Sequence, residues 1–297
     1  MISKFFRVIG VLSVCMIAFP GCSTTTQRTT KLSYSADADW RRVAQSSLII
    51  DGILGIPSLE IVSAERTGDH KHVTINATIN HILKGASPSN SVAIEHYTNS
   101  GDNGISNEHL ANFSKIPVIA FLLESEGKYY FINSGSDGLI SSTQERQREL
   151  QSEVRRQNLI LQNWSPNTSL PHYEKVQSLI RLIETNKLKS GAFRQLESLG
   201  TEAVPAMIAQ MDNRTPIPNT TLALKNLSGD AFEDYRQYRP EAVVDAIAAI
   251  LNQITGEGFG YIYNGGSETD RRHTVDAWRI YGMSHPAFQV SRPSISE

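Results

Sequence analysis

The sequence contains very little cysteine. Cys15 and Cys22 are its only two cysteines, and both lie close to the N-terminus. With so few thiols, a framework of disulfides is excluded, and the stability of the chain must come from buried apolar cores. A chain of 297 residues is long enough to form two domains of ordinary size around such cores.

An excess of charge of one sign is also missing. The 28 lysines and arginines nearly balance the 30 aspartates and glutamates, which leaves a formal net charge of -2. Proteins that bind nucleic acid usually carry a strong basic excess. We therefore expect no nucleic-acid partner.

The apolar run at the N-terminus is too short to cross a membrane. Residues 8–19 are mainly apolar, but such a helix falls short of a bilayer core of about 30 Å. The run follows the basic residues Lys4 and Arg7, a pattern typical of a secretory signal peptide. Beyond the signal, the chain is rich in serine and threonine and poor in apolar residues, so residues 23–44 are predicted to form a flexible tether.

The signal ends in the stretch FPGCSTTT, in which Gly21 precedes Cys22. This stretch resembles the lipobox of bacterial lipoproteins, although the two residues before Gly21 depart from the usual pattern. The resemblance implies that residues 1–22 are a lipoprotein signal peptide and that Cys22 carries the lipid anchor. Ser23 resembles the residue found in lipoproteins sent to the outer membrane, where the chain would face the periplasm. A signal peptide cut near this point without lipidation is the alternative.

Residues 45–141 show the period-two pattern of β-strands. In HVTINATINHILKG the apolar residues of the first half alternate with polar ones, and Ile82 and Leu83 then break the alternation, which predicts a bulge. The stretches SLIIDGILG, LEIVSAER, SVAIEHY, PVIAFLLES and KYYFINSG supply further strands, the last two joined by a tight turn at Glu126 and Gly127. Short strands with long, bent members predict an antiparallel β-barrel. The strand ending ILKG and the hairpin VIAFLLESEGKYYFI resemble OB-like or netrin-module-like barrels of secreted proteins.

The pattern becomes helical after the barrel. Ser142 and Glu145 form a capping-box pattern, so residues 142–169 are predicted to be a linker helix and loop. The stretch AFRQLESLGTEAVPAMIAQMDN resembles one HEAT-type helical repeat, with Gly200 ending its first helix and Pro205 near the start of its second. This resemblance implies that residues 170–284 form an all-α array of HEAT-like repeats.

The predicted fold class is therefore α+β with two domains, an N-terminal barrel and a C-terminal helical array. Residues 285–297 are predicted to be a tail beyond the last helix.

The glycine-rich stretch GEGFGYIYNGG raises the question of nucleotide binding. The glycine spacing is one residue short of the kinase G-x-G-x-x-G loop, and the preceding stretch AVVDAIAAILNQIT is helical rather than a strand. A structural role explains it better. Gly256 would end the helix, Gly258 and Gly260 would allow a tight turn, and Phe259 would pack near a buried Trp278. The longer pattern LNQITGEGFG…NGG…RR…VDAWRIY resembles the final unit of HEAT-like exported bacterial proteins, and no nucleotide or other cofactor is expected.

The remaining candidate sites are sparse. His70 and His72 would point to one side of a strand, which makes them weak candidates for metal ligands, but zinc needs three or four converging ligands. No G-x-S-x-G or H-E-x-x-H motif occurs, so no catalytic residue is assigned. If an active site lies at the domain junction, His96, Asp51 and Glu95 are its candidates.

These patterns lead to two hypotheses. In the first, the chain is a non-catalytic, lipid-anchored protein of the cell envelope that acts as a protein-interaction or scaffold module, with an envelope or secreted protein as its partner. In the alternative, it is an envelope hydrolase or a ligand-binding enzyme with its site at the domain junction.

Replacing the proposed anchor residue tests the localisation. Cys22→Ala should abolish lipidation and leave an uncut precursor, while the wild-type protein should partition into the detergent phase of membrane extracts. Metabolic labelling with a fatty acid and the mass of the mature N-terminus measure both effects. Identical processing and free solubility of the two proteins would contradict the lipoprotein assignment.

Overall fold

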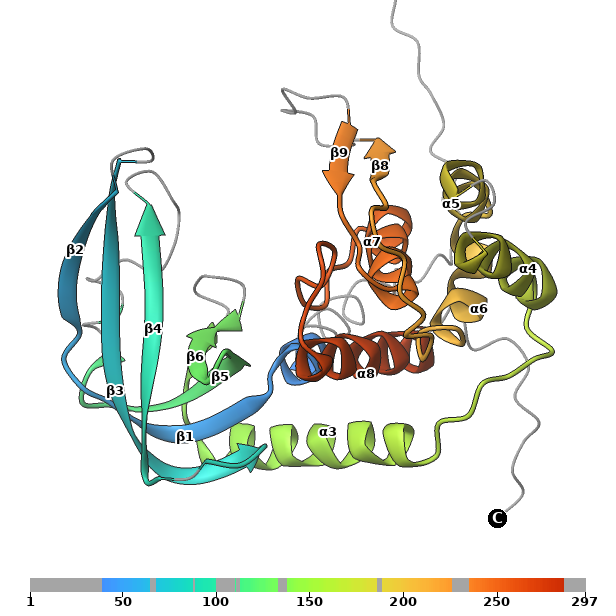
Figure 1. The fold of residues 1–297 in the computed structure, drawn as a ribbon. Coiled ribbons are helices and arrows are strands. Elements are labelled where there is room, and N and C mark those ends of the chain that lie inside the picture. Colours follow the sequence, from blue (N-terminus) through green and yellow to red (C-terminus); the bar gives the residue numbers. More distant parts are fainter. Residues whose placement is uncertain are drawn as a thin grey trace, which may run out of the picture.

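The chain folds into a mixed α+β structure in which a closed β-barrel is followed by a group of helices (Figure 1). The predicted α+β class and the predicted barrel are confirmed. The computed structural model describes residues 39–64, 68–87, 89–99, 110, 113–132, 138–185, 189–225 and 235–285.

The barrel is a ring of five strands. They are, in spatial order, β1 (Leu48–Leu54), β3 (Gly68–Lys84), β4 (Ser91–Asn99), β6 (Lys128–Phe131) and β5 (Pro117–Ser125), which pairs again with β1. All neighbours are antiparallel except β4 and β6, which are parallel, so the prediction of a wholly antiparallel barrel is wrong at this pair. A closed ring with an odd number of strands cannot alternate in direction throughout. The sheet is extended by β2 (Ser58–Ala64) beside β3 and by β7 (Leu139–Ser141) beside β5.

The long strand β3 contains the predicted bulge. Ile49 of β1 lies opposite Lys84, whereas the next residue, Ile50, lies opposite Ile82. Leu83 therefore has no partner residue in β1, which confirms the predicted break in alternation. A bulge redirects the side chains that follow it, and Lys84 accordingly points away from the barrel to reach the segment before β1.

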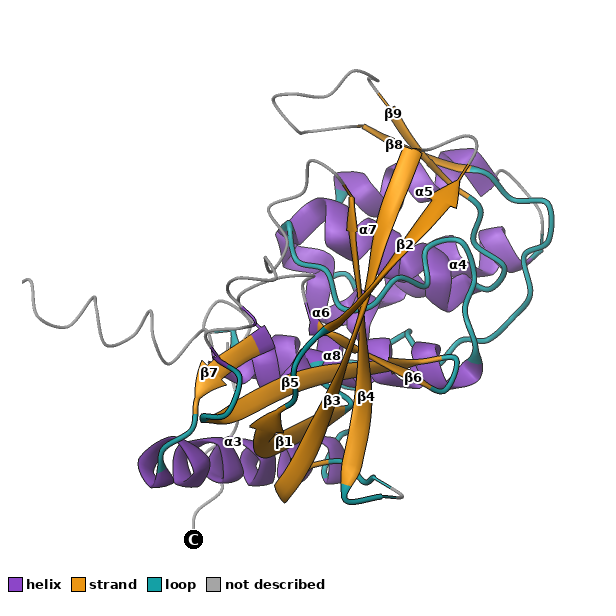
Figure 2. Cartoon of the chain, turned by 90° about the vertical axis from the view of Figure 1, so that its left-hand side faces the viewer, coloured by secondary structure: helices purple, strands orange, loops and turns teal. Residues whose placement is uncertain are grey.

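Alternation along the strands divides the barrel side chains between two cores. Val73, Ile75 and Ala77 of β3 are fully buried inside the barrel. A second cluster lies outside it, where Ile49 and Phe121 pack against the long helix α3 (Gln144–Gln162). In Figure 2 the strands lie in front of the helical part, and α3 passes along one end of the barrel.

The helical part follows α3. Its elements are α4 (Tyr173–Glu184), α5 (Lys189–Ser198), a 3-10 turn (Thr201–Ala203), α6 (Val204–Ile208), β8 (Leu222–Lys225), β9 (Tyr235–Tyr238), α7 (Val243–Thr255) and α8 (Glu268–Ser284). The antiparallel pair of β8 and β9 contradicts the prediction that this part is all α. These strands are only four residues each, too short for a period-two pattern to stand out in a helical region.

Polar side chains fix the start of α3 and the packing of α7 against α8. The N-cap of α3 is Thr143 rather than the predicted Ser142, whose hydroxyl instead donates to Asp51. Between α7 and α8, the fully buried carboxylate of Asp245 accepts two hydrogen bonds of 2.8 Å from Arg271. A buried carboxylate is tolerated only with such partners, so this ion pair fixes how the two helices pack.

A short helix over residues 39–45, the N-terminal helix, lies where the barrel part, α3 and α8 meet (Figure 1, blue). Trp40 and Ala44 are buried in the core of the helical part, while Val43, on another face, is buried in the cluster between barrel and α3. The predicted tether of residues 23–44 is therefore wrong over its last six residues, because these apolar side chains are buried. Residues 1–38, which include the predicted signal and Cys22, lie outside the described residues, as does the predicted tail from residue 286 on.

The core of the helical part is centred on Trp278. Its side chain is 0% exposed, as the sequence pattern predicts, and Phe259 meets it edge to face at 4.8 Å between ring centroids. Trp40 of the N-terminal helix completes the group, 6.1 Å from the Phe259 ring. Aromatic rings from three distant parts of the sequence thus form one cluster.

Removing the central ring of this cluster should destabilise the protein strongly. We predict that Trp278→Ala lowers the free energy of unfolding by about 3–5 kcal/mol, through lost burial and the cavity left behind. Thermal and urea unfolding followed by circular dichroism measure the loss. Trp164→Ala is the matched control, because Trp164 is only partly buried at the edge of the same core; a loss for Trp278→Ala no larger than that of the control would contradict the assignment.

Candidate functional site

The N-terminal helix is bound at its carboxyl end by side chains from distant elements. The last carbonyl groups of a helix have no partner within it. Here Lys84 Nζ donates a hydrogen bond to the carbonyl oxygen of Val43 at 2.6 Å, and His273 Nε2 donates to that of Gln45 at 2.9 Å. Lys84 comes from the barrel and His273 from α8, so both parts of the chain are attached to the same helix end.

His273 makes this contact as a neutral ring. Burial, and after it the nearby charge of Lys84, lower its pKa from the usual 6.5 to about 4, against the opposing effects of the Gln45 carbonyl and Asp270. At neutral pH the imidazole therefore has one N–H, which it donates to Gln45.

Two cavities adjoin the N-terminal helix. The first, the junction cleft, has a volume of about 590 Å³. Its lining residues come from the N-terminal helix, the barrel hairpin and the residue after it, β9, α7 and the glycine-rich loop: Arg41, Arg42, Gln45, Leu123, Ile132, Arg236, Tyr238, Asn252, Glu257, Gly258, Gly260, Tyr261 and Tyr263. The second, the Lys84 cavity, has a volume of about 600 Å³ and lies between the end of β3, α3 and α8. Volumes of this size are typical of binding sites for small molecules or for side chains of a partner.

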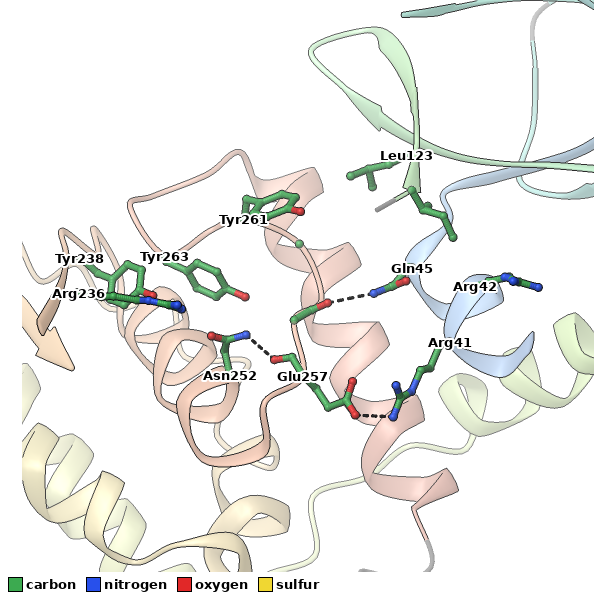
Figure 3. Close-up of a pocket in the computed structure, with 13 residues that line it drawn as sticks. Arg41, Arg42, Gln45, Leu123, Arg236, Tyr238, Asn252, Glu257, Tyr261 and Tyr263 are labelled. Atoms are coloured by element: carbon green, nitrogen blue, oxygen red, sulfur yellow. Dashed lines mark hydrogen bonds and ion pairs between the residues drawn. The ribbon is translucent and has the colours of Figure 1, made fainter. Parts of the chain in front are cut away.

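The charged groups of the junction cleft are mainly guanidinium groups. Figure 3 shows Arg236 on one side, with Tyr238 and Tyr263, and Arg41 on the other. Glu257, the only acidic residue in the lining, forms an ion pair with Arg41. The side chain of Arg236 makes no hydrogen bond or ion pair with any other residue that the structure describes. The cleft therefore offers hydrogen-bond donors and an excess of positive charge.

The glycine-rich loop forms one wall of this cleft. Gly256 ends α7 in the left-handed conformation with φ of 73°, as predicted. Gly260 also has positive φ, 82°, and a Cβ atom there would overlap the hydroxyl of Thr274. Gly258 is not among the residues with positive φ, but a Cβ atom on it would lie 3.2 Å from the Asn252 amide nitrogen. The loop therefore lies close to neighbouring side chains at both Gly258 and Gly260, and Gly260 in addition needs a positive φ.

The aromatic residues of the loop face in different directions. Phe259 is buried against Trp278, whereas Tyr261 is 80% exposed and so does not fasten the loop to the core. Tyr263 is partly buried beside Tyr238, at 5.5 Å between ring centroids. Burial, together with these neighbouring tyrosines, raises the pKa of Tyr263 to about 12, so its hydroxyl remains a neutral donor in the cleft.

The residues that the sequence suggested for a junction site lie elsewhere. His96 is buried in β4 on the barrel side, and Glu95, next to it, accepts a hydrogen bond from Lys128 at 3.0 Å. Asp51 is buried on β1 near the start of α3. None of the three is among the residues that line the junction cleft.

Asp51 nevertheless forms a small polar network. Its carboxylate accepts a hydrogen bond from the hydroxyl of Ser142 and lies 3.0 Å from Nδ1 of His81. In a nucleophilic triad the histidine stands between the serine and the carboxylate. Here the carboxylate stands in the middle, so the serine is not activated, and the network serves to join β1, β3 and the start of α3.

Of the two weak metal candidates, the structure describes the side chain of His72. His70 and His72 both lie in β3, and Nε2 of His72 is 3.5 Å from Glu95. In the part of the chain that the structure describes, no three His, Cys, Asp or Glu side chains are grouped to hold a metal ion.

Neither cavity was predicted from the sequence. The arginines of the cleft lie in the supposed tether and in β9, and the Lys84 cavity joins residues 84 and 276, far apart in sequence. One pattern was available: Trp40, Val43 and Ala44 have the spacing of buried residues on a helix. It predicts that this segment folds against a core.

No protein-family model matches this chain, and no curated protein sequence matches it either. Among the helices that the structure describes, none has the length and apolar character needed to cross a membrane.

The burial of His273 beside Lys84 should make stability depend on pH. Because the pKa of His273 is lower in the folded chain than in the unfolded chain, its contribution is fully present above about pH 6.5 and is lost as the pH falls toward about 4. The loss should amount to about 1–3 kcal/mol, measured by urea unfolding at a series of pH values. His273→Gln keeps a side-chain N–H donor without titrating in this range, so it should flatten the profile between these pH values. A profile as steep as that of the wild type would contradict this role.

Proposed function

We propose that this chain is a non-catalytic, lipid-anchored protein of the bacterial cell envelope that binds a partner protein. The signal-like N-terminus and the lipobox resemblance at Cys22 support the anchor, with the outer membrane, facing the periplasm, as its location. A lipid on Cys22 and the residues up to 38 would place the barrel and helical parts at a short distance from the membrane surface.

The junction cleft supports the binding role. Arginine and tyrosine are the residue types most enriched, with tryptophan, at the energetic centres of protein interfaces. The lining of the cleft contains three arginines and three tyrosines. Tyr261 is 80% exposed, so most of its ring area is available for contact. Because the lining has excess positive charge, the partner segment that fits it is acidic.

The proposal extends to the domain arrangement and to the kinds of barrel and helical array. We infer two domains, with the barrel of the OB-like or netrin-module-like kind, since it is a closed ring of five strands with one long, bent member. We infer likewise that α5 and α6 correspond to one HEAT-like repeat in a short array completed by α4, α7 and α8. Such arrays act mainly as surfaces for other proteins.

A hydrolase with its site at the junction is the competing function. No observation on the described residues favours it: the groups in the cleft are donors and cations, and the one carboxylate there is held by Arg41. The binding of a small molecule has more support, because the Lys84 cavity is lined by both apolar and charged residues.

The proposal predicts that the cleft prefers acidic over basic peptides. Fluorescence anisotropy with a labelled hexaglutamate peptide, and with hexalysine for comparison, measures it on the detergent-solubilised protein. Hexaglutamate should bind in preference to hexalysine. Arg236→Ala should weaken hexaglutamate binding about five- to tenfold, because truncating a central arginine of an interface costs roughly 1 kcal/mol or more.

An arginine outside the cleft provides the control. Arg148 lies exposed on α3, so Arg148→Ala removes the same charge from the protein without changing the cleft. Equal binding of the two peptides, or an equal effect of the two substitutions, would contradict the proposal that the cleft recognises an acidic segment.

A further inference from the structure

The Lys84 cavity has one apolar wall and one charged end. Its apolar wall consists of Ile82 and Leu83 from β3, with Leu161 from α3 and Ile280 from α8. Ile82 is 41% exposed, so part of its side chain is accessible to a ligand in the cavity. The charged end of the lining consists of Lys84 together with Arg272, His273 and Asp276 of α8.

The charged end has an excess of positive charge. Lys84 donates to the Val43 carbonyl, and Asp276 is the carboxylate in its surroundings. That carboxylate is shared, since it also lies 3.7 Å from a guanidinium nitrogen of Arg279. Arg272 contacts Thr269 at 3.5 Å and forms no ion pair within 4.0 Å among the described residues, although its charge acts on Asp276 and Glu268 from farther away.

We propose that the Lys84 cavity is a second binding site, which takes a small amphipathic carboxylic acid. The carboxylate of the ligand lies between Lys84 and Arg272, where it supplies the missing negative charge. Its apolar body covers Ile82 and Leu161. A purely polar anion would leave the apolar wall wet, and an amphipathic cation would meet two positive charges, so neither fits both ends of the cavity.

The protonation of Lys84 supports this assignment. Burial lowers the pKa of Lys84 to about 8, although the charge of Asp276 acts in the opposite direction. The other groups at this end are Arg272 and the neutral His273 of α8, while α3 contributes the uncharged Asn158. A ligand carboxylate would favour the charged amine, so binding at about pH 8.5 should take up a proton.

This site goes beyond the proposed partner-binding function and does not depend on it. The Lys84 cavity and the junction cleft are nevertheless connected through Gln45. Its backbone carbonyl accepts a hydrogen bond from His273, and its side chain donates one to the Gly258 carbonyl in the junction cleft at 3.1 Å. A ligand beside Lys84 therefore lies against the same helix that lines the cleft.

Calorimetric titration with decanoate tests the site, with decanol and decyltrimethylammonium of the same chain length as controls. Decanoate should bind at least tenfold more tightly than either control. Arg272→Gln should weaken decanoate binding about tenfold without changing the melting temperature, since Arg272 is exposed and makes one weak contact. Arg155→Gln, an exposed arginine of α3 outside the cavity, should have no effect.

Proton uptake distinguishes the cavity from other surfaces. Titrations at pH 8.5 in two buffers of different ionisation enthalpy should show uptake by the wild type, and Lys84→Met should abolish it. Titration with decyl phosphate distinguishes binding of a free carboxylic acid from binding of a phospholipid-like headgroup. Binding of decyl phosphate without decanoate, equal binding of decanol, or unchanged decanoate binding by Arg272→Gln would each overturn the assignment.

Discussion

The burial of the N-terminal helix between the barrel part and the helical part is the constraint on which the rest of the structure depends. Trp40 and Ala44 complete one apolar core and Val43 completes another, so this short segment contributes to both. A helix of this length has little stability of its own. It is stabilised by that burial and by the side chains of Lys84 and His273, which satisfy carbonyl groups at its end.

The same segment explains why the cavities lie where they do. Arg41 and Gln45 line the junction cleft, while Ala44 and the residues that follow the helix line the Lys84 cavity. The glycine-rich loop is held against the helix because Phe259 packs beside Trp40, and Gly258 accepts a hydrogen bond from Gln45. The glycines thus allow the loop to approach its neighbours closely.

Local patterns in the sequence were enough to predict some of these features. Alternation along β3 predicted its buried face and the bulge at Leu83, and helical spacing predicted the burial of Trp278, because each depends on neighbours within a few residues. The parallel pairing of β4 with β6 depends instead on closure of the ring. The contacts of Lys84 with Val43, and of His273 with Gln45, join residues more than forty positions apart and cannot be read from spacing. The candidate site was missed for this reason, since every wall of it comes from a different part of the chain.

Hydrogen exchange of the Trp40→Ala protein under native conditions tests the central role of the N-terminal helix most directly. If this helix holds the two parts together, amide protection should fall in both β1 and α8, which lie on its two sides, while β4, on the far side of the barrel, keeps its protection. Loss of protection confined to α8 and its neighbours would show that Trp40 is only a member of the helical core, and it would contradict the account.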